Sequence, residues 1–202
     1  MDILQKQLQP FKLVLASGSP RRKMLLEEMG LDFTIDTRPV EEKIPLGMSP
    51  GEAAVFLSKL KADAFESDYF LKNTLVITAD TVVAIDNEIL GKPSDKPEAV
   101  KMLQKLSAHK HEVITGVTLR SVNHEKSFSV STAVYFKQLA PDEIEYYVDN
   151  YKPFDKAGAY GIQEWIGHAG IEKIEGSYFN VVGLPTHRLY VELLEFLKLL
   201  RK

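Results

Sequence analysis

A short segment near the start of the chain carries residues suited to holding an anion. Residues 17–22 read Ser-Gly-Ser-Pro-Arg-Arg and follow the apolar run 13–16. A strand that ends in a Gly/Ser turn and enters a helix directs backbone N–H groups at one point, where the helix dipole adds positive charge. Arg21 and Arg22 supply planar forks of donors that match phosphate oxygens. The segment predicts a site for a phosphate-bearing ligand; the alternative is a capped surface helix with two solvated arginines.

An aspartate stands inside a second apolar run. Residues 75–83 read Leu-Val-Ile-Thr-Ala-Asp-Thr-Val-Val, and a carboxylate among such neighbours is costly unless it is paired or bound to a metal. At the end of a buried strand, Asp80 could hold a divalent cation or accept a proton from water. The alternative is a strand-end aspartate that caps a turn. Glu42, in the loop pair Glu41-Glu42, is a second metal ligand or a solvated side chain.

Lysines stand where they could meet phosphate groups. Lys92 follows a short strand in Glu-Ile-Leu-Gly-Lys-Pro, residues 88–93, and would otherwise be an ordinary exposed lysine. Lys59 and Lys61 lie between apolar positions of one predicted helix. One of these two side chains could therefore turn into a cleft and the other toward water.

A glycine-rich segment carries an amide side chain. Residues 154–163 read Phe-Asp-Lys-Ala-Gly-Ala-Tyr-Gly-Ile-Gln, and two glycines three positions apart imply close backbone approach. The Gln163 amide offers a paired donor and acceptor that can read the edge of a nucleobase. Asp155 and Lys156 could pair with each other or with the phosphate site. A structural loop stabilised by glycine is the alternative.

The composition limits the class of protein. The chain has 202 residues, 45% of them hydrophobic and 26% charged, so it can bury a sizeable core. The formal net charge of −3 gives no general attraction for nucleic acid, so positive charge for a polyanion must be gathered locally. The absence of cysteine excludes disulfides, cysteine-ligated zinc and cysteine nucleophiles. No apolar run has membrane-spanning length and residues 1–10 are unlike a signal peptide, so we expect a soluble, cytoplasmic protein that binds no membrane.

Three common catalytic signatures are absent. The sequence lacks Gly-x-x-x-x-Gly-Lys-Ser/Thr, which argues against a P-loop kinase or switch NTPase. It also lacks Gly-x-Ser-x-Gly, the signature of serine esterases, and its five histidines have no zinc-ligand spacing.

Helical and strand patterns alternate along the chain, which predicts an α/β fold. The expected strands span residues 12–16, 32–37, 74–78, 82–85, 88–90, 111–122 and 127–139, with hairpin turns at 86–87 and 123–124. The expected helices span residues 20–29, 50–65, 97–106, 141–149 and 185–200. Ser49 and Glu52 form a capping box at the start of the second helix. Residues 151–183 are expected to be glycine-rich and irregular.

Together these segments resemble the Maf family of nucleoside triphosphate pyrophosphatases from Lys12 onward. The resemblance rests on residues 17–22, on Ala-Asp-Thr-Val-Val at 79–83, on Gly-Lys-Pro at 91–93, on residues 155–163 and on Gly-Ser-Tyr-Phe-Asn-Val-Val-Gly-Leu-Pro at 176–185. It implies an elongated, two-lobed α/β fold with a mixed sheet, similar to inosine triphosphate pyrophosphatases, and a cleft between the lobes. Residues 12–202 would form one catalytic domain of two lobes after an extension at 1–11. The resemblance also implies a homodimer.

Three positions distinguish branches of this family. Arg22, Thr81 and Gln163 match the branch specific for dTTP and UTP. The branch resembling 7-methyl-GTP pyrophosphatases has Trp-Arg, Gln and Glu in the corresponding segments. The resemblance therefore implies hydrolysis of dTTP and UTP, and of modified pyrimidine triphosphates in a pool-cleaning role, to the monophosphate and pyrophosphate.

The residues and the resemblance together assign roles in such a reaction. The phosphate groups would be bound by Ser17, Ser19, Arg21, Arg22, Lys61 and Lys92. Asp80 would accept a proton from the attacking water, and Asp80 and Glu42 would hold Mg²⁺ or Mn²⁺. Thr81 and Gln163 would read the edge of the pyrimidine.

Three alternatives stay open. The chain could be a 7-methyl-GTP pyrophosphatase, or a nucleotide phosphatase that releases orthophosphate. It could also be a non-catalytic, nucleotide-binding regulator of cell division. The complete set of an acid, arginines and lysines favours an enzyme.

Overall fold

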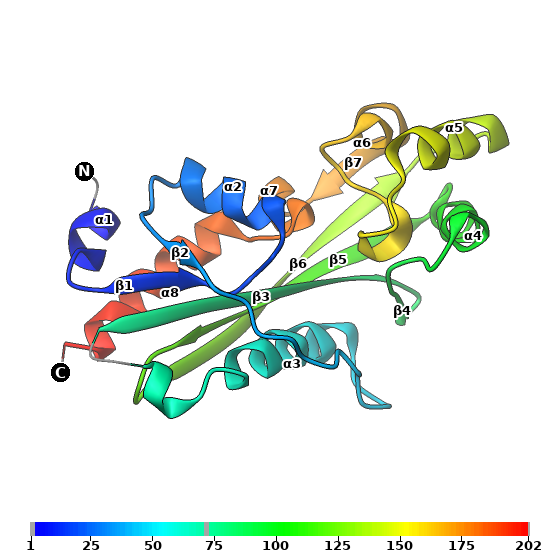
Figure 1. The fold of residues 1–202 in the computed structure, drawn as a ribbon. Coiled ribbons are helices and arrows are strands. Elements are labelled where there is room, and N and C mark those ends of the chain that lie inside the picture. Colours follow the sequence, from blue (N-terminus) through cyan, green and yellow to red (C-terminus); the bar gives the residue numbers. More distant parts are fainter. Residues whose placement is uncertain (1–2, 71–72, 202) are drawn as a thin grey trace.

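The computed structural model describes residues 3–70 and 73–201, and its fold is built on a seven-stranded mixed sheet (Figure 1). The strands are β1 (Lys12–Leu15), β2 (Thr34–Ile35), β3 (Thr74–Ile85), β4 (Glu88–Leu90), β5 (Lys110–Arg120), β6 (Glu125–Phe136) and β7 (Ile171–Glu175). Their order is β2-β1-β3-β5-β6-β7, with β4 paired to β3. β1 runs parallel to β2 and β3, and the other pairs are antiparallel. The α/β class with a mixed sheet is confirmed.

Helices cover both faces of this elongated sheet (Figure 1). They are α1 (Ile3–Leu8), α2 (Pro20–Glu28), α3 (Pro50–Asp63), α4 (Lys96–Leu106), α5 (Pro141–Tyr151), α6 (Trp165–Gly170), α7 (Tyr178–Val182) and α8 (Thr186–Leu199), with short 3₁₀ turns η1 (Ser67–Tyr69) and η2 (Ala157–Ala159). α3 packs on one face, and α2, α7 and α8 lie on the other. α4, α5 and α6 gather at the far end of the long strands.

The structure contains the helix starts and the hairpin turn that short sequence motifs predict. Ser49 and Glu52 form both bonds of the capping box that begins α3. Ser19 is the N-cap residue of α2 and Pro20 occupies its first turn, although the Ser19 side chain makes no capping hydrogen bond. The Asp86-Asn87 turn joins β3 to β4 with φ values of 50° and 64°, as a tight hairpin requires.

Two expectations about secondary structure are wrong. Asp80 does not end a strand, because β3 continues from Thr74 to Ile85 and pairs with β5 without a break from Val76 to Ala84. The antiparallel pairing with β5 supplies backbone hydrogen bonds through the Thr-Ala-Asp-Thr stretch at 78–81. The sequence pattern indicates a break in the strand there, because the stretch is polar. Residues 151–183 are not irregular, since they contain η2, α6, β7 and α7.

The first residues of the described chain pack onto its last helix. α1 contacts α8, and its Leu4 and Leu8 side chains are buried. The treatment of residues 1–11 as an extension and the division of 12–202 into two lobes stay predictions. Within residues 3–70 and 73–201, no helix has the length and apolar character needed to cross a bilayer.

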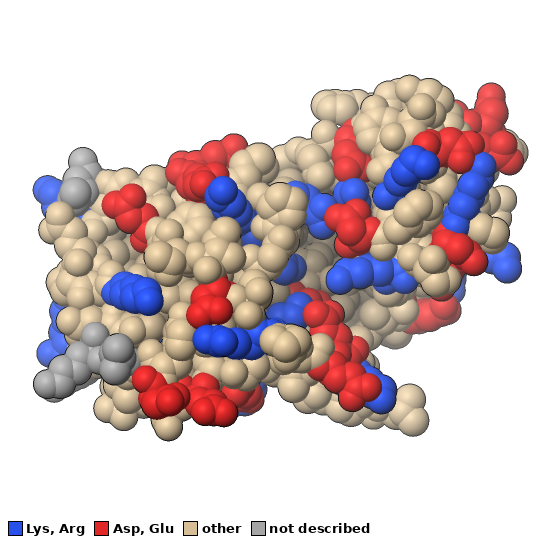
Figure 2. Space-filling view, in the orientation of Figure 1, with Lys and Arg blue, Asp and Glu red and all other residues tan. Residues whose placement is uncertain are grey.

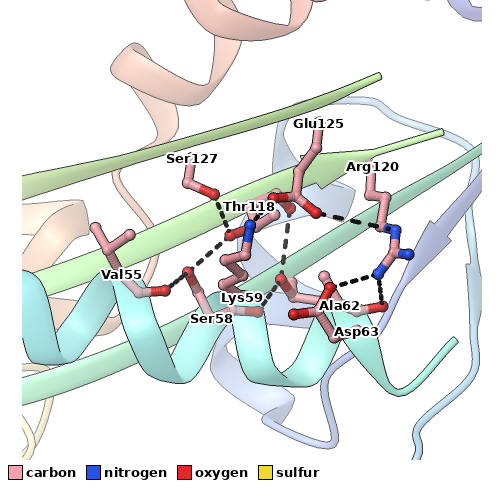
Figure 3. A network of polar contacts seen from close by, with 10 residues as sticks. Val55, Ser58, Lys59, Ala62, Asp63, Thr118, Arg120, Glu125 and Ser127 are labelled. Atoms are coloured by element: carbon pink, nitrogen blue, oxygen red, sulfur yellow. Dashed lines mark hydrogen bonds and ion pairs between the residues drawn. The ribbon is translucent and has the colours of Figure 1, made fainter. Parts of the chain in front are cut away.

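Helix α3 lies with its backbone against the sheet. A Cβ added to Gly116 of β5 would lie 2.2 Å from the backbone of Ala54, so only glycine permits this approach. The Thr78 hydroxyl donates to the Ser58 carbonyl (2.7 Å). The Ser58 hydroxyl lies 2.9 Å from that of Thr118 (Figure 3). These buried hydroxyls are each hydrogen-bonded and fix the helix over β3 and β5.

The exposed side of α3 is tied to the sheet by charged groups. Lys59 pairs with Glu125 at 2.5 Å, and Arg120 donates to the Ala62 carbonyl at 3.0 Å and to Asp63 at 2.7 Å (Figure 3). Exposed pairs of this kind add little stability individually. Their effect here is to hold Lys59 on the outside of the helix.

Replacing Gly116 with alanine should destabilise the protein, because α3 must move to admit the new methyl group. We expect the free energy of unfolding to fall by about 1–3 kcal/mol, the usual range for an overpacked core. Urea denaturation measures this change. Gly51→Ala in the first turn of α3 is the matched control, since its Cβ would meet only the Ser129 hydroxyl at 3.9 Å. Equal stability of the two variants would contradict the close approach.

A histidine of β5 is buried without charge. His111 is 1% exposed, and its Nε2 lies 2.7 Å from the hydroxyl of Tyr160, a residue of the glycine-rich segment. Its ring also packs edge-on against Phe136. Burial lowers the pKa of His111 from 6.5 to about 4. The folded protein therefore binds fewer protons than the unfolded chain between these values, and its stability falls as the pH drops below 6.5.

This histidine should give the protein a measurable pH dependence. Between pH 7.5 and pH 5 it should remove about 2 kcal/mol from the free energy of unfolding, since each pKa unit corresponds to about 1.4 kcal/mol. His111→Gln should lose that part of the dependence, whereas His187→Gln, at an exposed position, should keep it. Urea denaturation at both pH values provides the test, and equal pH slopes in the two variants would refute it.

Candidate active site

One edge of β3 changes partner in the middle of the strand. β1 pairs with it in parallel as far as Ile77, and β4 pairs with it antiparallel from Val83. In the described chain, residues 78–82 have no strand partner on this edge. Ala16, just after β1, still donates its N–H to the Ile77 carbonyl (2.8 Å), so the turn that follows lies at the opening. Ligands of α/β sheets bind at such changes of strand order, beyond the carboxyl ends of parallel strands.

A cavity of about 670 Å³ lies at this opening. Its lining contains every site residue expected from the sequence: Ser17, Ser19, Arg21, Arg22, Glu42, Lys61, Asp80, Thr81, Lys92 and Gln163. Figure 2 shows the hollow in the middle of one face of the molecule, with basic and acidic side chains around it. The volume suits a small-molecule ligand of nucleotide size.

Asp80 meets a lysine from the opposite wall. Side chains in a strand alternate between faces, so Asp80 points toward α3 as Thr78 does, two residues earlier. The Lys61 ammonium contacts the Asp80 carboxylate and lies 3.0 Å from Oε1 of Glu42. Partial burial acts to raise the pKa of Glu42, but the charges of Lys61, Lys92 and Arg22 outweigh it and hold the pKa below its ordinary value. Of the two lysines between apolar positions of α3, Lys61 is thus the inward one and Lys59 the outward one.

Arg22 holds three segments together. Its Nε donates to the Gly183 carbonyl (2.9 Å), one terminal nitrogen to the Ser17 hydroxyl (3.2 Å) and the other to the Thr81 hydroxyl (3.0 Å). Thr81 in turn lies 2.9 Å from the Thr115 hydroxyl on β5. Three of the five guanidinium donors are therefore used within the protein. Arg22 and Thr81, two of the three positions expected from the resemblance to set specificity, are therefore in direct contact.

Arg21 connects α2 to the glycine-rich segment on the other side of the cavity. Its guanidinium lies 3.2 Å from Asp155, which also pairs with Lys156 at 2.8 Å. Both pairings that the sequence left open for Asp155 and Lys156 are therefore realised. Burial acts to raise the pKa of Asp155, but Lys156 and Arg21 outweigh it and the pKa is lowered.

One cavity residue has no counterpart among the sequence predictions. The Arg38 guanidinium lies 5.4 Å and 5.5 Å from the ring centres of Phe65 and Tyr69, and 3.1 Å from Asp36. Its loop shows neither helical nor strand periodicity, so the sequence offered only an arginine four residues before Glu42 as a signal. The aromatic contacts that hold Arg38 at the cavity come from Tyr69 of η1 and from Phe65 in the turn after α3.

The cavity fits a divalent metal that arrives with its ligand. The described residues contain no cluster of three or more His, Cys, Asp or Glu side chains able to hold an ion alone. Asp80 and Glu42 both contact the same Lys61 nitrogen, so they face one small volume. Magnesium is commonly held by one or two carboxylates together with phosphate oxygens of the substrate. Metal binding between these carboxylates would require the Lys61 ammonium to move away from them.

A model of the Maf family, described as Maf-like protein, matches residues 12–196. The chain belongs to the Maf family. It is 51% identical over 195 residues to a protein of Christiangramia forsetii named dTTP/UTP pyrophosphatase, covering 96% of this chain and 99% of that one. Proteins with the same name from Flavobacterium psychrophilum and Porphyromonas gingivalis are 50% identical over 192 residues and 47% identical over 191. These alignments cover 95% and 94% of this chain, and 98% and 96% of those proteins. The Staphylococcus aureus Ham1 protein structure aligns with a TM-score of 0.42 at 16% identity, covering 62% of this chain and 71% of that one.

In this Maf-family chain, Arg22→Lys should weaken the junction of α2, β3 and the turn before α8. The three donors of an ammonium radiate from one nitrogen and cannot reach the three partners that the guanidinium bonds from three nitrogens, so at least one partner loses its bond. We expect the free energy of unfolding to fall by about 1–3 kcal/mol in urea denaturation. Lys23→Arg at the next, exposed position is the control and should change it little. An unchanged free energy of unfolding in Arg22→Lys would show that Arg22 does not brace the cavity.

Proposed function

We propose that this chain is a nucleoside triphosphate pyrophosphatase that hydrolyses dTTP and UTP to the monophosphate and pyrophosphate. The observation that carries the proposal is a single cavity that joins a cationic wall, a carboxylate pair and a buried amide. Relatives about half identical over nearly their whole length bear the name dTTP/UTP pyrophosphatase, which supports the same activity here.

The cationic wall accounts for binding of a triphosphate. Six basic residues line the described cavity against three acidic ones: Arg21, Arg22, Arg38, Lys61, Lys92 and Lys156 against Glu42, Asp80 and Asp155. A chain with a formal net charge of −3 thus gathers positive charge at one place. A triphosphate carries three to four negative charges, and such preorganised donors stabilise both its binding and the departure of pyrophosphate. Ser19 at the N-terminus of α2 and the Ser17 turn add polar groups beside them.

Asp80 is the proposed proton acceptor. Water attacks the α-phosphorus, a new P–O bond forms, the bond to the bridging oxygen breaks, and pyrophosphate leaves with its electrons. The water proton passes to an Asp80 carboxylate oxygen. A magnesium or manganese ion held by Asp80 and Glu42 would neutralise phosphate charge and polarise the phosphoryl group. Lys61 turns from the carboxylates to the phosphates when the substrate binds.

Gln163 and Thr81 are the proposed readers of the pyrimidine. Gln163 lines the cavity, and its Oε1 is buried with no hydrogen-bond partner among the described residues. A buried acceptor without a partner is costly, so a rotation of the amide toward a base that donates to this oxygen would be favoured. Modified pyrimidine triphosphates share this edge and fit the same proposal. A homodimer, a cytoplasmic location and two lobes that meet at the cavity belong to the proposal as well.

A substrate panel with a matched variant tests the activity. Purified protein is incubated with dTTP, UTP, CTP, dCTP, ATP, GTP and 7-methyl-GTP and with Mg²⁺ or Mn²⁺, and the products are resolved chromatographically. We expect selective conversion of dTTP and UTP to monophosphate and pyrophosphate. Asp80→Asn should reduce this turnover by about 100-fold or more, the effect of removing a general base.

Asp86→Asn is the control for the catalytic variant. Asp86 is exposed in the hairpin at the end of the same strand, with a φ of 50° that asparagine tolerates, so turnover should stay unchanged. Release of orthophosphate would point to a phosphatase, and a preference for 7-methyl-GTP would overturn the assignment of the three branch positions. Near-normal turnover by a folded Asp80→Asn would remove Asp80 from the mechanism. Binding of UTP without any turnover would favour a regulatory module.

A further inference from the structure

The turn that carries Gln163 fixes where its amide lies. The Glu164 N–H donates to the Gly161 carbonyl at 3.0 Å, so residues 161–164 form a closed turn with Gln163 at its third position. The N–H of Gly167 then donates to the Glu164 carbonyl at 2.9 Å as α6 begins. Since no side chain within the described residues bonds the Gln163 Oε1, its placement depends on this turn.

Two side chains outside the cavity brace both ends of the turn. Tyr147 of α5 is fully buried, and its hydroxyl accepts the Gly161 N–H at 3.0 Å and donates to the Glu164 carboxylate. Burial and the neighbouring Glu164 raise the pKa of Tyr147, so the phenol keeps the proton that it donates. Neither Tyr147 nor Glu164 lines the cavity. One hydroxyl therefore ties the first residue of the turn to the side chain of the last.

The same brace continues to the phosphate side of the cavity. The second carboxylate oxygen of Glu164 lies 3.0 Å from the Lys156 ammonium, which is buried. Lys156 pairs with Asp155, and Asp155 with Arg21 on α2. Polar contacts thus run without a gap from a proposed phosphate ligand to the turn that holds the proposed base reader. Networks of this kind fix geometry when every member is satisfied.

We propose that Tyr147 and Glu164 are positioning residues for pyrimidine recognition, acting through the 161–164 turn to hold the Gln163 amide at the cavity. The inference rests on the proposed dTTP/UTP activity and adds to it two residues that never touch the substrate. In this proposal Tyr147 and Glu164 place the Gln163 amide, whereas Asp80 takes part in bond cleavage. Loss of the brace should therefore affect discrimination between bases more than the rate of bond cleavage.

The test compares UTP with CTP, whose base presents the opposite donor and acceptor pattern at the same edge. Tyr147→Phe removes the hydroxyl and keeps the ring. We expect the ratio of kcat/KM for UTP over CTP to fall about three- to tenfold, the worth of one buried hydrogen bond. The change should appear as a higher KM for UTP, with kcat within about twofold of wild type.

Tyr146→Phe is the matched control, because the neighbouring phenol is 48% exposed and packs on Trp165 instead. It should leave the ratio unchanged. Glu164→Gln is the second variant; it keeps an acceptor for Tyr147 but loses the charge that pairs with Lys156, and should lower the ratio in the same direction. Circular dichroism and thermal melting establish that each variant is folded.

The possible outcomes distinguish failure of the positioning role from failure of the proposed function. If wild type prefers UTP and the folded Tyr147→Phe and Glu164→Gln variants keep the full preference, the positioning role is overturned and the proposed function stands. A fall in kcat with an unchanged ratio would also overturn it, because the brace would then serve catalysis or general stability. If wild type shows no preference for UTP over CTP, the proposed function fails and the inference falls with it.

Discussion

The site depends on the interrupted pairing along one edge of β3. A strand in a sheet is normally covered on both edges, but here a parallel partner ends at Ile77 and an antiparallel partner begins at Val83. The five residues between them stay open on that side while β5 holds the opposite edge rigid. The opening places Asp80 and Thr81 at a cavity without loosening the strand that carries them. Alternation along the strand then sends Asp80 toward α3 and Thr81 toward Arg22 of α2.

The charged groups of the cavity are held in place by one another. Lys61 lies between Asp80 and Glu42, and Arg21 is paired with Asp155. Lys61 and Arg21 therefore have carboxylate partners before a ligand arrives, which avoids leaving these partly buried charges unpaired. A polyanion that enters can exchange these partners for phosphate oxygens. The position of Lys61 follows from the close packing of α3 on the sheet, which is possible only because residue 116 is a glycine.

Two separate braces serve two parts of the same site. Arg22 ties the Ser17 turn, Thr81 and the turn before α8 together, so it fixes the proposed phosphate site to the sheet. On the other side, the Tyr147 hydroxyl closes the 161–164 turn. Arg21 and Asp155 connect the two sides across the cavity. Side chains on both sides of the cavity thus set the distance between the proposed phosphate site and the proposed base reader.

The sequence by itself determined the local elements and the chemistry of the site. The capping box at Ser49, the hairpin at 86–87 and the strand before residues 17–22 follow from short-range preferences of a few neighbouring residues, and the structure confirms them. Every site residue expected from these motifs lines the cavity, although Arg38 was not among them, and the family follows from the motifs. Tertiary structure alone decided the continuity of β3, since the Thr-Ala-Asp-Thr stretch is kept extended by β5 and not by its own pattern.

Only the fold could decide which side chains meet. Arg22 contacts Gly183 and Arg21 contacts Asp155 across 161 and 134 residues of chain, and no local pattern encodes partners so distant. The inward turn of Lys61 was decided by the packing of α3, and the role of Tyr147 by the placement of α5 beside the glycine-rich segment. Local propensity acts over one turn or one strand, whereas these contacts arise from burial of surfaces that come together only when the whole sheet has formed.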